Sequence, residues 1–225
     1  MPIQRDDLLD RLGRLQVSSV CDADKSIVPL PSSLRPLFEG VTIVGPAYLV
    51  QTDDDHLTTY CGVTRAEPGS ILLIATNNKH EHKAIIGGLF TNEARRRGLR
   101  GVVVLGNVRD LRDMRRVGLP IWFQGTNAAA GGMSKLPDPE LSELRVESGQ
   151  IVRNGDIIMA DDDGVIVMPR EQAERAIAKA EEIEAKEGAI VRNVSRDVPL
   201  SECINAEEYI EALKAGKPIP FEYHV

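Results

Sequence analysis

Residues 87–110 read GGLFTNEARRRGLRGVVVLGNVRD, and this stretch decides which fold the sequence predicts. Helical composition runs over residues 84–97 and ends at Gly98, because glycine readily adopts the left-handed conformation that closes many helices. Residues 101–105 form an unbroken apolar run, which is typical of a strand buried on both faces. A helix followed directly by a buried strand indicates an α/β fold.

The apolar patterns on either side of this stretch continue the alternation. Helices are expected over residues 3–16, from about 18, within 52–66, after 110 and from 169 to about 186. Strands are expected over 41–51 (two segments around a Gly-Pro break), 70–75, 119–123, 144–146, 149–152, 157–159 and 164–168. Because no linker-like composition interrupts the pattern, we expect one domain over residues 1–195. A polar tail, residues 196–225, would pack on its own or a neighbouring subunit.

Composition and charge exclude several classes of protein. The 225 residues are 42% hydrophobic and 27% charged, which is ordinary for a globular chain. A net charge of −7 argues against a nucleic-acid-binding face. The chain has no apolar run near the roughly 20 residues of a membrane span, and no signal-peptide segment. Its three cysteines are widely spaced, so we expect reduced thiols and a cytoplasmic protein without membrane association.

The chemistry is expected where Gly87-Gly88 and Arg109-Asp110 come together. Backbone N–H groups at a helix start can hold a carboxylate, and glycine lets a ligand approach them closely. Arg109 could grip the same carboxylate through two nitrogens. Asp110 would point to the other side of the extended chain, where it could hold Mg²⁺ through oxygen. This pattern suits a small 2-oxo acid, although a purely structural Arg-Asp ion pair would look the same in sequence.

Several segments together resemble one known family. They are VSSVCDAD, VGPAYLV, EPGSILLIA, the stretch 87–114, LPIWFQGT and VRNGDIIMADDDGVIVMPREQAERAI. In this order, over about residues 10–190, they resemble the family named for the regulator of ribonuclease activity A. That family includes the class II 4-hydroxy-4-methyl-2-oxoglutarate and 4-carboxy-4-hydroxy-2-oxoadipate aldolases. The resemblance implies an α/β fold, a β/β/α swivelling sandwich like a phosphohistidine domain, with flanking helices.

The resemblance also implies roles for individual residues. The family's pyruvate-binding arginine falls on Arg109, and its metal-binding aspartate falls on Asp110. The amides that meet the pyruvate carboxylate fall on Leu89 and Phe90. Some aldolases use a glutamate from the neighbouring subunit's C-terminal helix, for which Glu187 is the candidate here.

For the whole protein, the resemblance implies a carbon–carbon lyase that uses Mg²⁺ or Mn²⁺. Family members cleave aldols or decarboxylate oxaloacetate, and both reactions pass through a pyruvate enolate. They assemble as homotrimers or homohexamers with active sites at subunit boundaries.

The sequence departs from the aldolases at two positions. Gly88 stands where they carry an acidic residue that helps to hold metal-bound water, and Leu105 replaces an aspartate. His80 and His82, with Glu81 between them, precede the glycine pair and could supply the missing acid, or they could belong to a solvated loop. His56 is expected to be exposed to solvent.

Two other functions stay open at this stage. The family's namesake inhibits a ribonuclease through protein contacts, so the chain could be a non-catalytic regulator. The same scaffold could also carry another reaction, such as dehydration, on a hydroxy acid or sugar acid.

Overall fold

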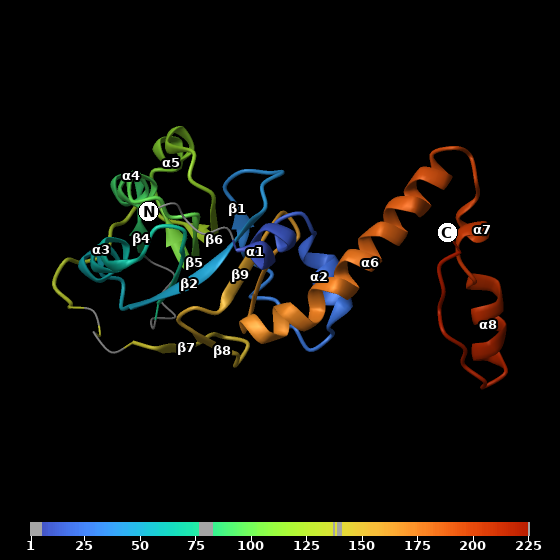
Figure 1. The fold of residues 1–225 in the computed structure, drawn as a ribbon. Helices are drawn as coiled ribbons and strands as arrows, with labels where there is room; N and C mark the ends of the chain where they lie inside the picture. Colours follow the sequence, from blue (N-terminus) through green and yellow to red (C-terminus); the bar gives the residue numbers. More distant parts are fainter. Residues whose placement is uncertain (1–5, 77–82, 137, 139–140, 225) are drawn as a thin grey trace.

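The computed structural model describes residues 6–76, 83–136, 138 and 141–224. Its main sheet has the strand order β1-β6-β5-β3-β2-β9-β10, with β4 paired to the end of β5 (Figure 1). The strands of this sheet are β1 (Arg35–Pro36), β2 (Ile43–Thr52), β3 (Ile71–Thr76), β4 (Ala84–Ile86), β5 (Gly101–Val108), β6 (Ile121–Thr126), β9 (Ile157–Ala160) and β10 (Val165–Met168). Strands β2 to β6 pair in parallel, whereas β1, β9 and β10 pair antiparallel. β7 (Glu143–Arg145) and β8 (Ile151–Arg153) form a separate antiparallel hairpin.

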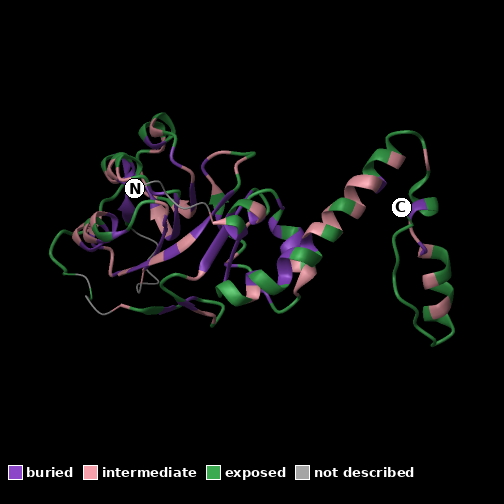
Figure 2. Cartoon of the chain, viewed as in Figure 1, coloured by how far each residue is buried: buried purple, intermediate pink, exposed green. Residues whose placement is uncertain are grey.

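Helices cover the sheet in two groups. The first group shares a hydrophobic cluster with β9 and β10 and consists of α1 (Asp7–Leu12), α2 (Val17–Ala23) and the first half of α6 (Arg170–Val194). The second group packs on β3, β5 and β6 and consists of α3 (His56–Arg65), α4 (Gly88–Arg96) and α5 (Leu111–Val117). A third cluster lies between the sheet and the β7–β8 hairpin. Figure 2 shows the buried residues concentrated in the strands. The α/β fold with flanking helices is therefore confirmed.

Strand β2 is continuous through Gly45 and Pro46, where the sequence had predicted a break. Its first residues, 43–46, pair with β9, and residues 47–52 pair with β3. A Cβ on residue 45 would lie 2.9 Å from the carbonyl oxygen of Gly69, so glycine permits this close approach of two backbones. The Gly-Pro pair marks a change of pairing partner instead of an interruption.

Strand β4 corrects the helix predicted for residues 84–97. The structure places Ala84–Ile86 in a strand beside β5, and the helix begins only at Gly88. Three fully buried apolar residues fit a strand and a helix equally well, so their composition did not separate the two. The consequence matters for the site, because Gly87 and Gly88 now stand at the junction between a strand end and a helix start.

Helix α6 is longer than predicted and ends at Val194. Ala173, Ala176, Ile177 and Ala180 bury one face of its first half against α1 and α2, at the spacing of an amphipathic helix. Its second half projects away from the body of the molecule and carries the tail, which holds α7 (Leu200–Cys203) and α8 (Ala206–Lys214) (Figure 1). The division into a domain of residues 1–195 and a packing tail stays a prediction.

No helix in the described ranges, α6 included, combines the length and the apolar character that a bilayer span requires.

Candidate functional site

Arg109 and Asp110 follow the last residue of β5, and Asp110 turns the chain sharply. Its backbone is left-handed (φ 61°, ψ 35°), a conformation that aspartate adopts more readily than most residues. This turn folds the carboxylate back toward Arg109, whose Nε lies 3.7 Å from Oδ2 of Asp110. The expectation that the two side chains point to opposite sides is wrong, because it assumed an extended backbone at Asp110.

The glycine pair lies directly against these two side chains. The N–H of Gly88 donates a hydrogen bond to Oδ2 of Asp110 at 3.1 Å. A Cβ on residue 87 would fall 2.5 Å from the same oxygen and 3.1 Å from Cγ of Arg109. A Cβ on residue 88 would fall 3.1 Å from Cβ of Asp113. Glycine is therefore needed at residue 87 to keep Asp110 in place, and residue 88 has little room for a side chain.

Leu89 and Phe90 supply the two further N–H groups of the first turn of α4. These groups have no acceptor within the helix, and no described residue accepts a hydrogen bond from them. Leu89 is 90% exposed, whereas Phe90 is partly buried against the hydrophobic cluster that α3, α4 and α5 share with β3, β5 and β6. The turn is thus anchored by Phe90 and open to solvent at Leu89, as an anion-binding helix start requires.

Arg109 has an unsatisfied donor at this place. Its Nε is buried and has no hydrogen-bond partner within the described part of the chain, since 3.7 Å to Asp110 is too long for a hydrogen bond. This atom also lies 3.4 Å from where a Cβ of residue 87 would be, so it borders the first turn of α4. Buried donors are rarely left without an acceptor, and the Arg109 side chain as a whole is 37% exposed, so Arg109 is a candidate to bind a ligand beside that turn.

The Asp110 carboxylate is a suitable ligand for a hard divalent cation whose other ligands come from water and substrate. Asp110 has a half-exposed carboxylate, and no cluster of three or more His, Cys, Asp or Glu side chains suited to a metal exists among the described residues. Mg²⁺ commonly binds to one or two carboxylates and completes its shell with water and substrate oxygens. Asp110 therefore fits such an ion, but it would not hold one as a closed structural site.

His56 is a neighbour of the site that the sequence did not reveal. It is half-buried instead of exposed, and its Nε2 accepts a hydrogen bond from the N–H of Gly131 at 3.1 Å. Burial lowers the pKa of His56, and the positive charge of Arg109 lowers it further, while nearby carboxylates oppose both effects. An imidazole that accepts a hydrogen bond and has a lowered pKa is neutral at neutral pH. Only the spacing of His56 after three aspartates was visible in the sequence.

Asp55 fixes the wall of the site beside His56. Its carboxylate is buried and accepts hydrogen bonds from four backbone N–H groups, those of Leu57 and Thr58 at the start of α3 and of Ser134 and Lys135. Burial alone would raise the pKa of Asp55, but these bonds together hold it below its usual value.

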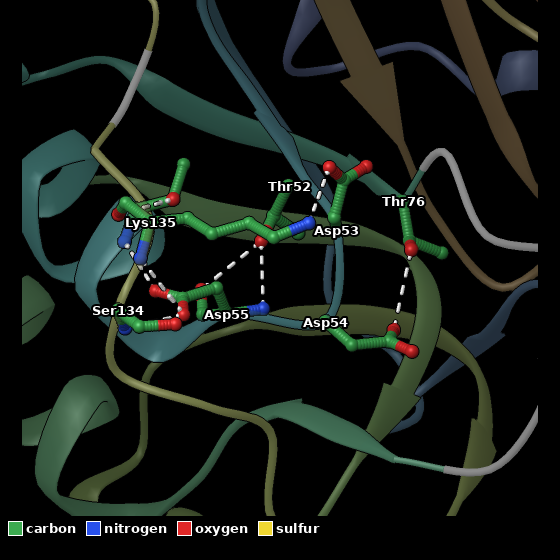
Figure 3. A network of polar contacts seen from close by, with 8 residues as sticks. Thr52, Asp53, Asp54, Asp55, Thr76, Ser134 and Lys135 are labelled. Carbon is green, nitrogen blue, oxygen red and sulfur yellow. Dashed lines mark hydrogen bonds and ion pairs between the residues drawn. The ribbon is translucent and has the colours of Figure 1, made fainter.

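Further contacts join the same two segments. Lys135 also forms an ion pair with Asp53 at 2.8 Å, and Figure 3 shows both aspartates facing this segment. Residues 131–135 are thereby tied to the loop between β2 and α3.

Of the remaining predicted site residues, only Glu187 lies in the described part of the chain, and it is far from Arg109. Glu187 lies on the projecting half of α6, whereas α4 and α5 are on the opposite side of the molecule (Figure 1). His80 and His82 lie outside the described residues. The structure therefore brings together Gly87 to Phe90, Arg109 and Asp110, and it adds His56.

Comparisons with known proteins agree with this architecture. The family model described as RraA-like, Aldolase/RraA, matches residues 17–167. A protein of Halalkalibacterium halodurans named "Putative 4-hydroxy-4-methyl-2-oxoglutarate aldolase" is 30% identical over 194 residues, which cover 85% of this chain and 90% of that protein.

Two solved structures are similar in fold. The crystal structure of Streptomyces coelicolor RraAS2, described as an unusual member of the RNase ES inhibitor RraA protein family, is 26% identical. It has a TM-score of 0.70 and covers 83% of this chain and 98% of its own. An uncharacterised protein from Pseudomonas syringae pv. tomato has a TM-score of 0.76 at 21% identity, over 90% and 97% of the two chains.

Proposed function

Since the chain belongs to the RraA-like family, Aldolase/RraA, we propose that it is a divalent-metal-dependent lyase of small 2-oxo acids. The proposed reactions are retro-aldol cleavage of 4-hydroxy-4-methyl-2-oxoglutarate and decarboxylation of oxaloacetate, which both release pyruvate. One observation carries the proposal: the buried Nε of Arg109 has no hydrogen-bond partner among the described residues and borders the open first turn of α4.

In this proposal the carboxylate of the 2-oxo acid lies between Arg109 and α4. The guanidinium supplies charged donors from one side, and the N–H groups of Leu89 and Phe90 supply neutral donors from the other. The positive end of the helix dipole adds to the attraction. Gly87 keeps this space free, because any side chain there would displace Asp110 or Arg109. The acid is thus held with its keto group toward Asp110.

Asp110 is the residue that would hold Mg²⁺ or Mn²⁺. Such an ion, when bound, polarises a keto oxygen and stabilises negative charge that develops on it. The protein's own residues fix the Asp110 carboxylate in place. The left-handed backbone of Asp110 directs the carboxylate into the site, and the Gly88 N–H donates a hydrogen bond to one of its oxygens. Removing a hydrogen bond that orients a metal-binding side chain typically lowers metal affinity or activity by about 10–100-fold.

We propose further that the active protein is a homotrimer or homohexamer with its sites at subunit boundaries. The projecting half of α6 supports this, because it carries Glu187 away from the site of its own chain (Figure 1). Exposed apolar residues near its end, Val191 at 63% and Val194 at 44%, are what a subunit contact would cover. Light scattering of the purified protein is expected to give a multiple of the 24.7 kDa chain.

A pyruvate-release assay tests the proposed reaction. Oxaloacetate and 4-hydroxy-4-methyl-2-oxoglutarate are supplied separately, with Mg²⁺, with Mn²⁺ or with a chelator. We expect metal-dependent release from at least one of them, abolished by Arg109→Ala. The matched control is Arg112→Ala, because Arg112 is three residues away and its side chain is 81% exposed. Absence of metal-dependent release from both substrates would overturn the lyase.

A regulator that binds another protein is the second candidate, and one observation favours it. Helix α8 has no buried residue, and Ile210 and Leu213 on it are each about half exposed. If Arg109 and Asp110 are purely structural, titration with pyruvate should give no heat of binding. The lyase is expected to bind pyruvate and to give such heat. Loss of that heat in Arg109→Ala separates the two functions.

A further inference from the structure

The second half of α6 and the tail form a folded arm, residues 181–224, that stands away from the body of the molecule (Figure 1). Cys203 of α7 is 1% exposed, so the arm has a buried interior of its own. The side chain of Asn205 donates to the carbonyl oxygen of Pro220 at 2.9 Å and accepts from the N–H of Glu222 at 2.8 Å. These contacts fix the last residues against the start of α8 and give the arm a defined surface.

The surface of the arm is unusually apolar for a part of the chain that no other part covers. Among the described residues, eight of the thirteen large hydrophobic side chains that are exposed belong to the arm. They are Val191, Val194, Leu200, Ile210, Leu213, Ile219, Phe221 and Tyr223. Exposed apolar side chains gathered in one place commonly mark a protein interface. The arm therefore has the surface of a segment that binds another chain.

The exposed face of α8 is acidic as well as apolar. Ile210 and Leu213 lie about one turn apart, and Glu207 and Glu211 lie beside Ile210 at helical spacing. Glu211 pairs with Lys214 at 2.7 Å, whereas Glu207 forms no ion pair with any described residue. The tail as a whole has six carboxylates and three basic side chains. The partner of this face therefore needs apolar and basic side chains.

The body of the molecule has a strongly basic region around α4 and α5. Residues 93–118 contain eight arginines and three carboxylates, which gives this region a net charge of +5. The whole chain carries −7, so the rest of it carries −12. Opposite charges of this kind favour the association of two surfaces and select their relative orientation.

Helices α4 and α5 present their last turns together. At their starts, a Cβ on Gly88 would fall 3.1 Å from Cβ of Asp113. At their ends, Nη1 of Arg95 lies 3.5 Å from the carbonyl oxygen of Gly118. The two helices are thus packed side by side in the same direction, as Figure 1 shows, and the arginines at their ends share one surface.

The local carboxylates do not neutralise this surface. Glu93 accepts two hydrogen bonds from Arg96, each of 2.7 Å, and Asp113 pairs with Arg116 at 3.3 Å. Each of these two carboxylates is therefore already engaged by an arginine of its own helix.

Two arginines at the helix ends are left over. Arg95 and Arg115 are exposed, and neither forms an ion pair with any described residue. Arginine binds a carboxylate through two parallel hydrogen bonds, which suits it to a glutamate from another chain. Val117, half-buried at the end of α5, adds apolar surface beside them. The ends of α4 and α5 thus offer the basic and apolar side chains that the α8 face needs.

We propose that the α8 face of one subunit docks on the ends of α4 and α5 of a neighbouring copy of this chain. Its apolar side chains contact Val117, and its glutamates pair with Arg95 and Arg115. The arm does not meet these helices in its own chain, because they lie on the opposite side of the molecule (Figure 1). This inference rests on the proposed homo-oligomer and not on the proposed lyase.

Swapping the charges of the two surfaces tests the docking. Sedimentation velocity of the full-length protein measures the concentration at which half of the oligomer dissociates. We expect Arg95→Glu with Arg115→Glu to raise this concentration at least tenfold, and Glu207→Arg with Glu211→Arg to do the same. The protein with all four substitutions is expected to return to within threefold of the wild type, because the pairs are restored with their signs exchanged.

Two controls accompany the swap. Glu147→Arg with Glu171→Arg makes the same change in net charge at exposed positions outside both surfaces, and it should leave the dissociation concentration within threefold of the wild type. Circular dichroism shows whether each variant is folded, and Arg95→Gln with Arg115→Gln replaces the reversed pair if that pair unfolds. Raising NaCl from 0.05 to 0.5 M should weaken the wild-type oligomer, since salt screens exposed charges.

Three results would overturn the proposal. A wild-type protein that stays monomeric would remove the docking together with the homo-oligomer. An oligomer that is insensitive to either reversed pair would remove the docking alone and leave α8 to a different partner. Four substitutions that dissociate the oligomer as strongly as one pair would show that the two surfaces do not meet. Pyruvate release from the wild-type protein tests the lyase separately, so its failure is distinguishable from all three.

Discussion

Oδ2 of Asp110 lies 3.7 Å from Nε of Arg109 and accepts the N–H of Gly88 at 3.1 Å, although successive residues of a strand face opposite ways. The left-handed backbone of Asp110 makes this possible, because it turns the chain between the end of β5 at Val108 and the start of α5 at Leu111. The arginine and the aspartate therefore lie on one side of the chain, both beside the first turn of α4.

Two substitutions at Asp110 distinguish the role of its carboxylate from the role of its left-handed backbone. Asp110→Gly suits the left-handed conformation, so we expect a stable protein that has lost metal-dependent pyruvate release. Asp110→Ala is expected to be less stable than Asp110→Gly by about 1 kcal/mol, because a Cβ is strained at φ 61°. Metal affinity from calorimetry and stability from urea unfolding measure the two effects. Full metal binding in Asp110→Gly would show that the carboxylate is not the ligand.

Gly87→Ala is expected to lower activity without unfolding the protein. Its new Cβ would fall 2.5 Å from Oδ2 of Asp110, so the carboxylate must move. We expect at least a tenfold loss of kcat/KM for pyruvate release. Gly188→Ala, on the projecting half of α6, is the control, because its Cβ would meet only the tip of Arg192 at 3.4 Å. That variant is expected to gain about 0.5–1 kcal/mol of stability.

Gly88 and Asp113 are expected to be coupled. Gly88→Asp places a Cβ 3.1 Å from that of Asp113, so this variant alone should lose stability and activity. The contact is with the Cβ of Asp113, which Asp113→Ala would keep. The second substitution is therefore Asp113→Gly, which removes this Cβ. We expect the double variant to recover at least half of the stability lost by Gly88→Asp. Additive losses in urea unfolding would contradict the coupling.

Asp55 is expected to be among the most important polar residues for stability. Asp55→Ala removes four hydrogen bonds to backbone N–H groups, and we expect a loss of about 3 kcal/mol in the free energy of unfolding. Asp53→Ala breaks an ion pair at the surface and is expected to cost less than about 1 kcal/mol. Equal losses for the two variants would show that the buried carboxylate does not fix residues 131–135.

The lowered pKa of His56 predicts that the folded protein loses stability as the pH falls. Its pKa is lowered in the folded protein by burial and by Arg109, so the unfolded chain binds a proton more readily. Stability should therefore be complete above about pH 6.5, the ordinary histidine value, and decline as the pH falls toward the lowered pKa. Asp55 and Asp110 face the imidazole and moderate the shift. His56→Asn is expected to flatten the decline between pH 7 and 5, and an unchanged decline would assign it to other groups.

The sequence was sufficient for the fold class, and the structure places the predicted pair Arg109 and Asp110 beside Gly87 and Gly88. The apolar run of β5 and the helical pattern from residue 169 were sufficient to predict both elements, although α6 extends further than expected. Ala84–Ile86 was mistaken for the start of a helix, because three buried residues are too few to show a period.

The details of the site depended on tertiary structure. The orientation of Asp110 follows from a single left-handed residue, and no local pattern marked it. His56 reaches the site only because residues 131–135 return to α3, a contact between segments about 75 residues apart in the chain. The need for glycine at residue 87 follows from its contact with the Asp110 side chain, which the sequence does not show.

Strand β2 has a consequence for how the chain folds. Its residues 47–52 find their partner β3 about twenty-five residues later, whereas residues 43–46 pair with β9, more than a hundred residues away. Closing the longer loop costs more chain entropy and slows the encounter. During synthesis, the parallel strands can therefore associate while the first half of β2 still has an unpaired edge. That edge stays open to pairing with other chains until the β9–β10 hairpin has left the ribosome.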